Sequence, residues 1–356
     1  MKFPPVVKIS LFLLGLVAFL FIIYIAQGII LPLIFAALVA IILHPVVNLI
    51  MRLRIHRIIA ITITLLLSSI LVAAFGTFFY SQFNSLSESL PLFIDRGTEI
   101  FNETNAWAIN HFDLKPEKIH EWIAEYKGEF LNKNGDEIGK TLVSLGSLLG
   151  ALFITPVYVF LFLYYHPLLL EFFHRLFGKG NRSEVTVIIT EVKTLIQSYL
   201  VGLSIEVAII AILYTVGLLI LGIKYALILA ILGALLNVIP YLGAILAAIM
   251  PMFIAFATKT QPLYFLLVLA MYIIIQFIDN NFLVPKIVAS KVKINVLVSI
   301  FAVIAFGALW GIPGMFLSIP LTAIVKLIFD HIETLKPWGF LLGDTMPSKI
   351  KPFQKK

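Results

Sequence analysis

The side chains best suited to bind a polar solute lie inside long apolar stretches of this chain. The stretch 225–257 carries no charge, and Asn237, Pro240 and Gly243 stand in its middle. Proline removes a backbone donor and glycine tolerates open backbone conformations, so helical hydrogen-bonding groups would be left free there. Irregular backbone persists at membrane depth only where it is buried in protein or lines a cavity. This break is therefore a candidate substrate-binding site.

A second apolar stretch, 294–330, is interrupted in the same way. Its break contains Gly311, Pro313 and Gly314, and no charge precedes Lys326. Free backbone groups and helix ends can bind charged or hydroxylated solutes. We therefore predict that this second break also contributes to the substrate site.

Four polar residues near these stretches are candidates for ion coupling. Glu206 is the one acid well inside an apolar span, and an ionisable group there is a functional hypothesis by default. A structural hydrogen bond to a neighbouring helix is the equal alternative for Glu206. Asp279, Asn280 and Asn281 lie near the end of the next span, 263–284, where a helix cap or a loop anchor competes with a ligand role.

The length of the 225–257 stretch predicts a helical hairpin. A single helix over it would extend roughly 50 Å, whereas the hydrocarbon core of a bilayer is about 30 Å thick. A strongly tilted, proline-kinked helix is the alternative. The lysines that follow, Lys286, Lys291 and Lys293, favour the hairpin. If 225–257 enters and leaves on the same side, these lysines are cytoplasmic, as the positive-inside rule expects, whereas a single crossing would place them outside. With a second hairpin at 294–330, the two halves form an inverted repeat whose interrupted segments would meet.

Composition restricts the class of protein. The chain has 356 residues, of which 61% are hydrophobic and only 13% charged, so we expect an all-α polytopic membrane protein. It has no cysteine, which excludes disulfides and thiolate metal sites. No ATP-binding, metalloprotease or serine-hydrolase motif occurs, and no basic stripe points to nucleic acid. We predict no catalytic residue, no metal site and no cofactor.

About eight membrane segments are expected, including the two re-entrant hairpins. The arginines between the second and third spans, Arg52, Arg54 and Arg57, place the N-terminus in the cytoplasm. The expected regions are the N-terminal spans (1–80), an acidic extracytoplasmic amphipathic region (81–140), a span (141–165), cytoplasmic amphipathic helices (166–198), a transport region (199–330) and a basic cytoplasmic tail (331–356).

Several short motifs coincide with these features. They are Tyr199-Leu200-Val201-Gly202, Leu236-Asn237-Val238-Ile239-Pro240-Tyr241-Leu242-Gly243, Asn281-Phe282-Leu283-Val284-Pro285-Lys286, and Gly311-Ile312-Pro313-Gly314 with Pro320. With them, the chain resembles the autoinducer-2 exporter (AI-2E) family of bacterial membrane proteins over nearly its whole length. The resemblance implies hairpins in substrate handling, elevator-like transport and a homo-oligomer, a pentamer. Glu206 is an acid at a position where many members are apolar. In this respect the chain resembles a cation-coupled branch of the family.

Three hypotheses follow for function. The leading one is a secondary exporter of a small polar, autoinducer-2-like molecule across the bacterial inner membrane. The second is a sodium or lithium/proton antiporter that uses Glu206. The third, from another class, is a membrane scaffold whose 81–140 region recruits partners. In all three the lipid bilayer surrounds the spans, and H⁺ or Na⁺ is a partner only of a coupled transporter.

Overall fold

The computed structural model of this chain is built from helices. It describes residues 4–112, 155–176, 182–240, 243–259, 261, 263–289 and 292–345, and within them the only β-type pairing is one bridge from Ile294 to Gly343. The helices are α1 (Pro5–Ile25), α2 (Gln27–Arg52), α3 (Arg57–Phe112), a helix over Thr155–Tyr164, α5 (His166–Leu176), α6 (Arg182–Ile220), α7 (Ala226–Asn237), α8 (Gly243–Thr258), α9 (Leu263–Ile278), the π-helix η2 (Asp279–Ala289), α11 (Val296–His331), the 3-10 helix η3 (Glu333–Leu335) and α12 (Lys336–Leu342).

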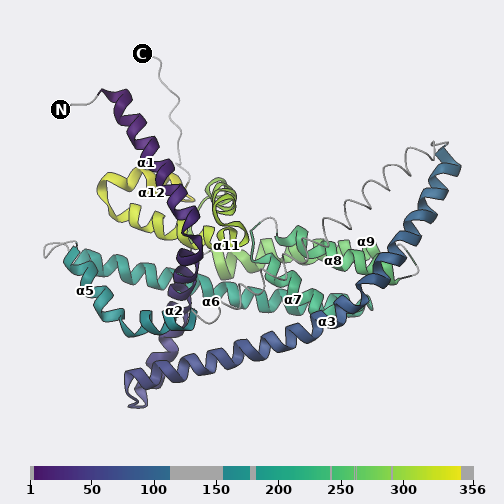
Figure 1. Cartoon of the computed structure of the whole chain (residues 1–356), viewed down its shortest axis with the longest axis horizontal. Helices are drawn as coiled ribbons and strands as arrows, with labels where there is room; N and C mark the ends of the chain where they lie inside the picture. Colours follow the sequence, from purple (N-terminus) through teal and green to yellow (C-terminus); the bar gives the residue numbers. More distant parts are fainter. Residues whose placement is uncertain are drawn as a thin grey trace.

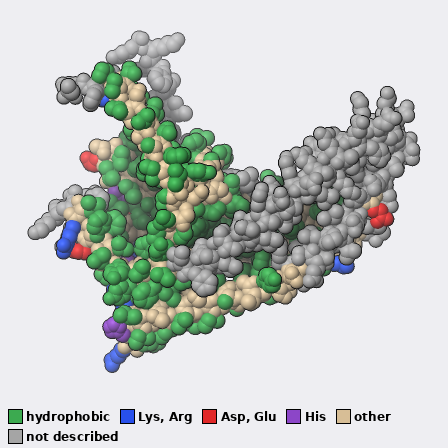
Figure 2. Space-filling model, in the orientation of Figure 1, with side chains coloured by type: hydrophobic (Ala, Val, Ile, Leu, Met, Phe, Trp, Pro, Cys, Tyr) green, Lys and Arg blue, Asp and Glu red, His purple; other side chains and the backbone are tan. Residues whose placement is uncertain are grey.

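Six helices in the described part are long and apolar enough to cross a membrane. A seventh span is possible where the helix over Thr155–Tyr164 bends by 63° into α5. Apolar side chains of these helices face outward: Leu14 in α1 is 71% exposed, and Figure 2 shows hydrophobic side chains covering much of the described surface. Such a surface suits lipid and not water. The chain is therefore an all-α polytopic membrane protein, as the composition predicts.

Helix α6 lies at the centre of the molecule. It packs against α2, α5, α7, α9, η2 and α11, and Figure 1 shows α7, α8 and α9 beside its C-terminal half. Its continuity differs from the sequence expectation, which separates a cytoplasmic amphipathic helix at 166–198 from a span that begins at Tyr199. Because 182–220 contains no proline, nothing in the backbone interrupts the helix, and the two segments form one.

The long α3 also extends beyond its expected span. It continues from Arg57 past residue 80 to Phe112, so the start of the 81–140 region is helical. The amphipathic helix predicted after Pro116, on Ile119, Trp122, Ile123, Tyr126 and Phe130, lies outside the described residues. So does most of the span predicted for 141–165.

The first broken stretch folds as a helical hairpin of α7 and α8. A Cβ atom added to Gly243 would overlap the carbonyl oxygen of Leu236, so the chain reverses between Asn237 and Gly243. At the other end, the Lys259 Nζ lies 3.0 Å from the position of a Gly222 Cβ. The hairpin therefore begins and finishes at the same end of the bundle.

The second broken stretch reverses inside α11. Gly311 has φ 64° and ψ −144°, which is not helical and favours glycine, and α11 is two helices joined there. A Cβ on Gly314 would overlap the carbonyl oxygen of Phe306, although these residues would be about 12 Å apart along a straight helix. Asn295 closes the base, because its Nδ2 donates to the carbonyl oxygens of Leu341 (2.7 Å) and Gly343 (3.0 Å).

The two halves of the 199–330 region run in opposite directions. Gly202 of α6 lies against Ile287 of η2, whose carbonyl oxygen is 2.6 Å from the glycine's Cβ position. Further along α6, Tyr214 stacks on Tyr272 of α9 with 4.3 Å between ring centroids. Residue numbers rise in α6 as they fall in α9, so these helices are antiparallel. This is the polarity expected of an inverted repeat.

Candidate functional site

A cavity of about 600 Å³ lies where the first hairpin's tip meets α6 and η2. Its volume is in the range of small-ligand sites. Its polar lining comes from α6, the hairpin tip, the α9–η2 junction and the base of the second hairpin: Tyr199, Glu206, Asn237, Gln276, Asp279, Asn280, Lys293 and Ser299. Pro240 lines it as well. Five residues proposed from sequence thus come together: Glu206, Asn237, Pro240, Asp279 and Asn280.

One hydrogen bond joins the hairpin tip to η2. The Asn237 Nδ2 donates to the Asp279 Oδ2 over 2.9 Å, across 42 residues of sequence. Asn237 is the last residue of α7 and Asp279 the first of η2, so the bond connects two helix ends. A hydrogen bond to a carboxylate is among the stronger kinds. The bond therefore fixes the tip at the cavity.

Other polar groups beside this bond lack partners. Asp279 is 1% exposed, and its Oδ1 receives no hydrogen bond from the described residues, nor does the buried Oε1 of Gln276. The second contact to Asp279, from the Gln276 Nε2 to Oδ2, is long at 3.5 Å. Buried acceptors without donors are costly and call for an explanation. Hydroxyl or amine donors of a bound solute, or a cation, would satisfy both oxygens.

Asp279 is the first residue of the π-helix η2. A π-helix is wider than an α-helix, and such segments often mark functional sites. Pro285 sits inside η2 and lacks the backbone N–H that helical bonding needs. The sequence expectation treats residues from 285 to 293 as a loop, whereas helix continues to Ala289.

Glu206 is buried in the wall of this cavity. It is 6% exposed, and its carboxyl group has no hydrogen bond or ion pair to any described residue. None of the described residues therefore supplies the structural hydrogen bond that the sequence leaves as an alternative. A carboxyl group in this position is free to bind a solute, a cation or a proton.

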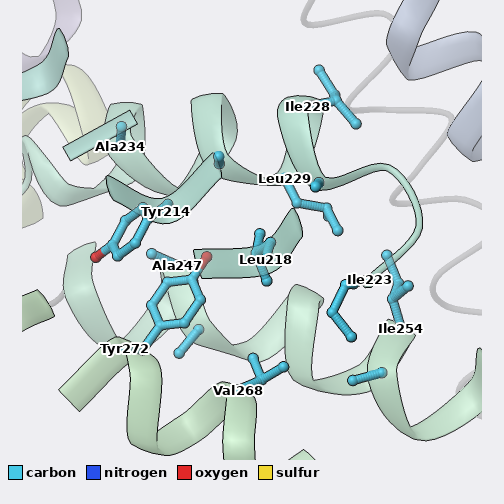
Figure 3. Close-up of a cluster of buried hydrophobic side chains, with 14 of the residues drawn as sticks. Tyr214, Leu218, Ile223, Ile228, Leu229, Ala234, Ala247, Ile254, Val268 and Tyr272 are labelled. Atoms are coloured by element: carbon cyan, nitrogen blue, oxygen red, sulfur yellow. The ribbon is translucent and has the colours of Figure 1, made fainter. Parts of the chain in front are cut away.

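Two stacked tyrosine rings, Tyr214 and Tyr272, pack against the first hairpin. Figure 3 shows Tyr214 and Tyr272 together beside Ala247, and Gly233 of α7 passes over them with its Cβ position 3.3 Å from the Tyr272 hydroxyl. Both hydroxyl groups are buried without a partner. The pair belongs to a buried cluster formed almost wholly by α6, α7, α8 and α9. These four helices therefore share one core.

The second hairpin's tip lies away from this cavity, whereas the sequence predicts that both interrupted segments meet at the substrate site; that part of the site stays a prediction. Gly311, Pro313 and Gly314 do not line the cavity. Beside them, the Trp310 Nε1 donates to the Ile23 carbonyl oxygen of α1 over 3.4 Å. The positions of the hairpin bases explain this difference.

The first hairpin begins beyond the end of α6, about 20 Å past Glu206, and its 12-residue first arm returns the tip to that level. The second hairpin follows η2, whose end already lies beside Gly202. Its base therefore lies at the cavity, and its tip lies away from the cavity by the length of one helical arm.

Two remaining candidates also stay out of the lining. Gly243 is buried at the hairpin turn, where it permits the close approach to Leu236. Asn281 is exposed, and its Nδ2 donates to the Phe277 carbonyl oxygen of the preceding turn (2.8 Å). Sequence analysis did not select Lys293 and Ser299, because only the fold brings them to Glu206. Tyr199 begins the motif Tyr199-Leu200-Val201-Gly202, and this motif is the sequence signal that could have identified it as a site residue.

Among the described residues, no three His, Cys, Asp or Glu side chains gather as a metal-ligand group. What the cavity offers instead is two buried carboxyl groups, amides, and one lysine at its margin.

Comparison with known proteins identifies the group to which this architecture belongs. The model of the AI-2E family transporters matches residues 13–334, which is most of the chain. The chain belongs to the AI-2E transporter family. It is 28% identical over 327 residues to the AI-2 transport protein TqsA of Escherichia coli (strain K12), with 90% of each chain covered.

Other relatives of this transporter are similarly distant. The "Putative transport protein YrrI" of Bacillus subtilis (strain 168) is 26% identical over 258 residues, which cover 72% of this chain and 71% of YrrI. The "Putative transport protein YhhT" of Escherichia coli (strain K12) is 25% identical over 353 residues, or 97% and 96% of the two chains. Family membership makes the chain a multi-pass bacterial membrane transporter of a small solute in a lipid bilayer.

Proposed function

We propose that this transporter exports a small, hydroxyl-bearing polar molecule of the autoinducer-2 kind through the cavity at Asp279. The observation that carries the proposal is the pair of unpartnered acceptors, Asp279 Oδ1 and Gln276 Oε1, in a cavity of about 600 Å³. Solute hydroxyl groups would donate to them, and Asn237 would hold the carboxylate in place. The similarity to an AI-2 transport protein supports this class of solute.

An elevator-type movement is our proposal for how the solute crosses. Helices α6 to α9 share one buried cluster, α2, α3 and the helix over Thr155–Tyr164 share another, and a third cluster joins α2 and α11 to the N-terminal half of α6. Packed clusters shift against each other as bodies because they resist continuous deformation, so the third cluster would be the surface along which the movement occurs. The α6–α9 unit, which holds Glu206, Asn237 and Asp279, would carry the solute. A homo-oligomer, a pentamer, would anchor the other core.

A specific observation favours a second candidate, sodium or lithium/proton antiport. Glu206 and Asp279 are both buried carboxyl groups of one cavity, and the described residues offer Glu206 no partner. Either group could exchange a proton for a cation. A scaffold without transport is the third alternative, and no contact in the described residues favours it.

Proteoliposomes containing the purified protein distinguish these functions. We expect labelled autoinducer-2 to leave the vesicles, and Asp279→Asn to abolish that flux because the carboxylate acceptor is lost. Asn281→Asp, an exposed change outside the cavity, is the matched control and should transport normally. Lithium-triggered proton movement without solute flux would replace the exporter with the antiporter. If neither flux occurred, the membrane scaffold would be the remaining hypothesis.

A further inference from the structure

A second cavity, of about 670 Å³, lies at a different place in the fold. It is enclosed by α2, the bent pair of Thr155–Tyr164 and α5, the N-terminal half of α6 and the end of α11. Most of its lining is aliphatic or aromatic, including Ile41, Phe162, Leu170, Ile189 and Ile328. It shares no lining residue with the cavity at Asp279. Its chemistry is therefore independent of the proposed transport site.

A small group of nitrogen-bearing side chains occupies one part of this lining. The Lys193 Nζ donates to the His44 Nδ1 over 3.2 Å, and Asn48 donates to the same nitrogen over 3.0 Å. The His166 ring lies 5.0 Å from the His44 ring. Because Nδ1 of His44 accepts both bonds, its remaining ring hydrogen is on Nε2 and can be donated to a ligand. The Lys193 ammonium and the rings of His44 and His166 thus lie close together.

Positive charge in this group is not balanced by nearby carboxylates. Lys193 forms no ion pair among the described residues, and its hydrogen-bond partner is the His44 imidazole. Glu333 also lines the cavity, but its side chain is 92% exposed and pairs with Lys336 at 3.7 Å. Glu191 pairs with His331 at 3.4 Å. A half-buried cation without a counter-charge attracts an anion.

The cluster also lies at the arginine-rich end of the bundle. The Arg57 guanidinium donates to the Leu163 carbonyl oxygen over 2.6 Å, three residues before His166. Arg57 follows the turn that contains Arg52 and Arg54, which the positive-inside rule assigns to the cytoplasm. Basic pockets between spans on that side are typical sites for anionic lipid head groups.

We propose that this second cavity binds an anionic phospholipid, with the phosphate on Lys193, His44 and His166 and an acyl chain along the apolar wall. A phospholipid combines both properties of the cavity, since a free phosphate would leave most of the apolar part of this cavity of about 670 Å³ unused. The surrounding bilayer supplies such a molecule directly to a site between helices. The bound lipid would fill the space between α2, α5, α6 and α11.

Native mass spectrometry of the purified chain, titrated with phosphatidylglycerol, tests this site. We expect phosphatidylglycerol to bind about tenfold more tightly than phosphatidylcholine with the same acyl chains, because phosphatidylcholine carries the same phosphate together with a trimethylammonium group that the Lys193 ammonium repels. Lys193→Gln should remove the preference and Lys193→Arg should keep it. Lys224→Gln, which changes an exposed lysine at the base of the first hairpin, is the matched control and should change nothing.

A second variant tests the apolar part of the site. Ile189→Trp should weaken both lipids by filling the cavity, provided that it elutes as the wild type does on gel filtration. The polar test by Lys193→Gln stands even if this variant misfolds. Equal binding of the two lipids to the wild type would overturn the proposal, as would a preference that survives Lys193→Gln. Competition by glycerol 3-phosphate as strong as that by phosphatidylglycerol would also overturn it, because a soluble anion would then suffice.

Discussion

At the residue scale, the Asn237–Asp279 bond is the contact on which the site depends. The bond is short at 2.9 Å, and the other contact to Asp279 is at the limit of hydrogen bonding at 3.5 Å. Asn237→Ala would leave a buried carboxylate nearly without donors, which typically costs about 1–3 kcal/mol. We therefore expect a lower thermal midpoint in detergent and reduced flux, because the hairpin tip is released.

Asn281→Ala is the control for this change. Its exposed amide donates only within its own helix, to Phe277, so its removal should stay within about 0.5 kcal/mol of the wild type. Equal effects of the two substitutions would mean that the bond to Asp279 contributes nothing of its own. A double-mutant cycle of Asn237→Ala with Asp279→Asn measures the coupling directly.

Glu206 gives the second prediction at this scale. Because it has no hydrogen bond within the described residues, both Glu206→Gln and Glu206→Leu should fold and elute as the wild type does. If the carboxyl group carries a proton or a cation, both variants lose coupled flux in proteoliposomes, since neither can titrate. Full pH-dependent transport by Glu206→Gln would reject that role. We would then assign the solute site to Asn237 and the backbone at Pro240.

Sequence reasoning identifies the polar residues of this site better than their partners. Glu206 and Asn237 stand out because an apolar span makes any polar residue conspicuous. Their meeting with Asp279, Lys293 and Ser299 depends on where two hairpins begin, which is a tertiary property. The buried, unpaired oxygen of Asp279 could not be predicted, because its burial results from packing against the hairpin tip.

At the element scale, close backbone approach at glycine defines the two hairpins. A Cβ on Gly314 would overlap the Phe306 carbonyl oxygen, so Gly314→Ala must push the arms of α11 apart. Overpacking of this kind costs about 1–3 kcal/mol. We expect a lower thermal midpoint for Gly314→Ala, measured by intrinsic fluorescence on heating.

Gly76→Ala in α3 provides the comparison, because nothing lies within 4 Å of its Cβ position. Alanine is the better helix former, so this variant should be as stable as the wild type or more stable. If Gly314→Ala were equally harmless, the arms of α11 would not be in contact. The hairpin assignment would then be wrong.

The elements themselves are unequally predictable. Length, absence of charge and central Gly and Pro predict both hairpins, because these features act locally. The join of two predicted segments into α6 shows the opposite case, since a change from amphipathic to fully apolar pattern need not interrupt a helix. The π-helix at Asp279 has no local signal of its own. It lies against Gly202 of α6 and is joined to the first hairpin's tip by the Asn237–Asp279 bond.

At the scale of the whole molecule, the length and packing of α3 indicate which side of the membrane each turn faces. Helix α3 extends about 33 Å from Arg57 to Phe79, which is one bilayer thickness, and Phe79 packs against the core of α6–α9. The turn at Arg54 and the base of the first hairpin should therefore face opposite sides of the membrane. We propose that Arg54 and both termini are cytoplasmic.

Single cysteines can test this topology cleanly, because the chain has none of its own. Lys224→Cys and Lys259→Cys stand at the two ends of the first hairpin, which lie together through the contact of Gly222 with Lys259. In intact cells both should react with a membrane-impermeant maleimide, whereas Arg54→Cys should react only after permeabilisation. Reaction of Lys224→Cys and Lys259→Cys from opposite sides would make 225–257 a single crossing. The inverted repeat, and with it an elevator built on the α6–α9 unit, would then be lost.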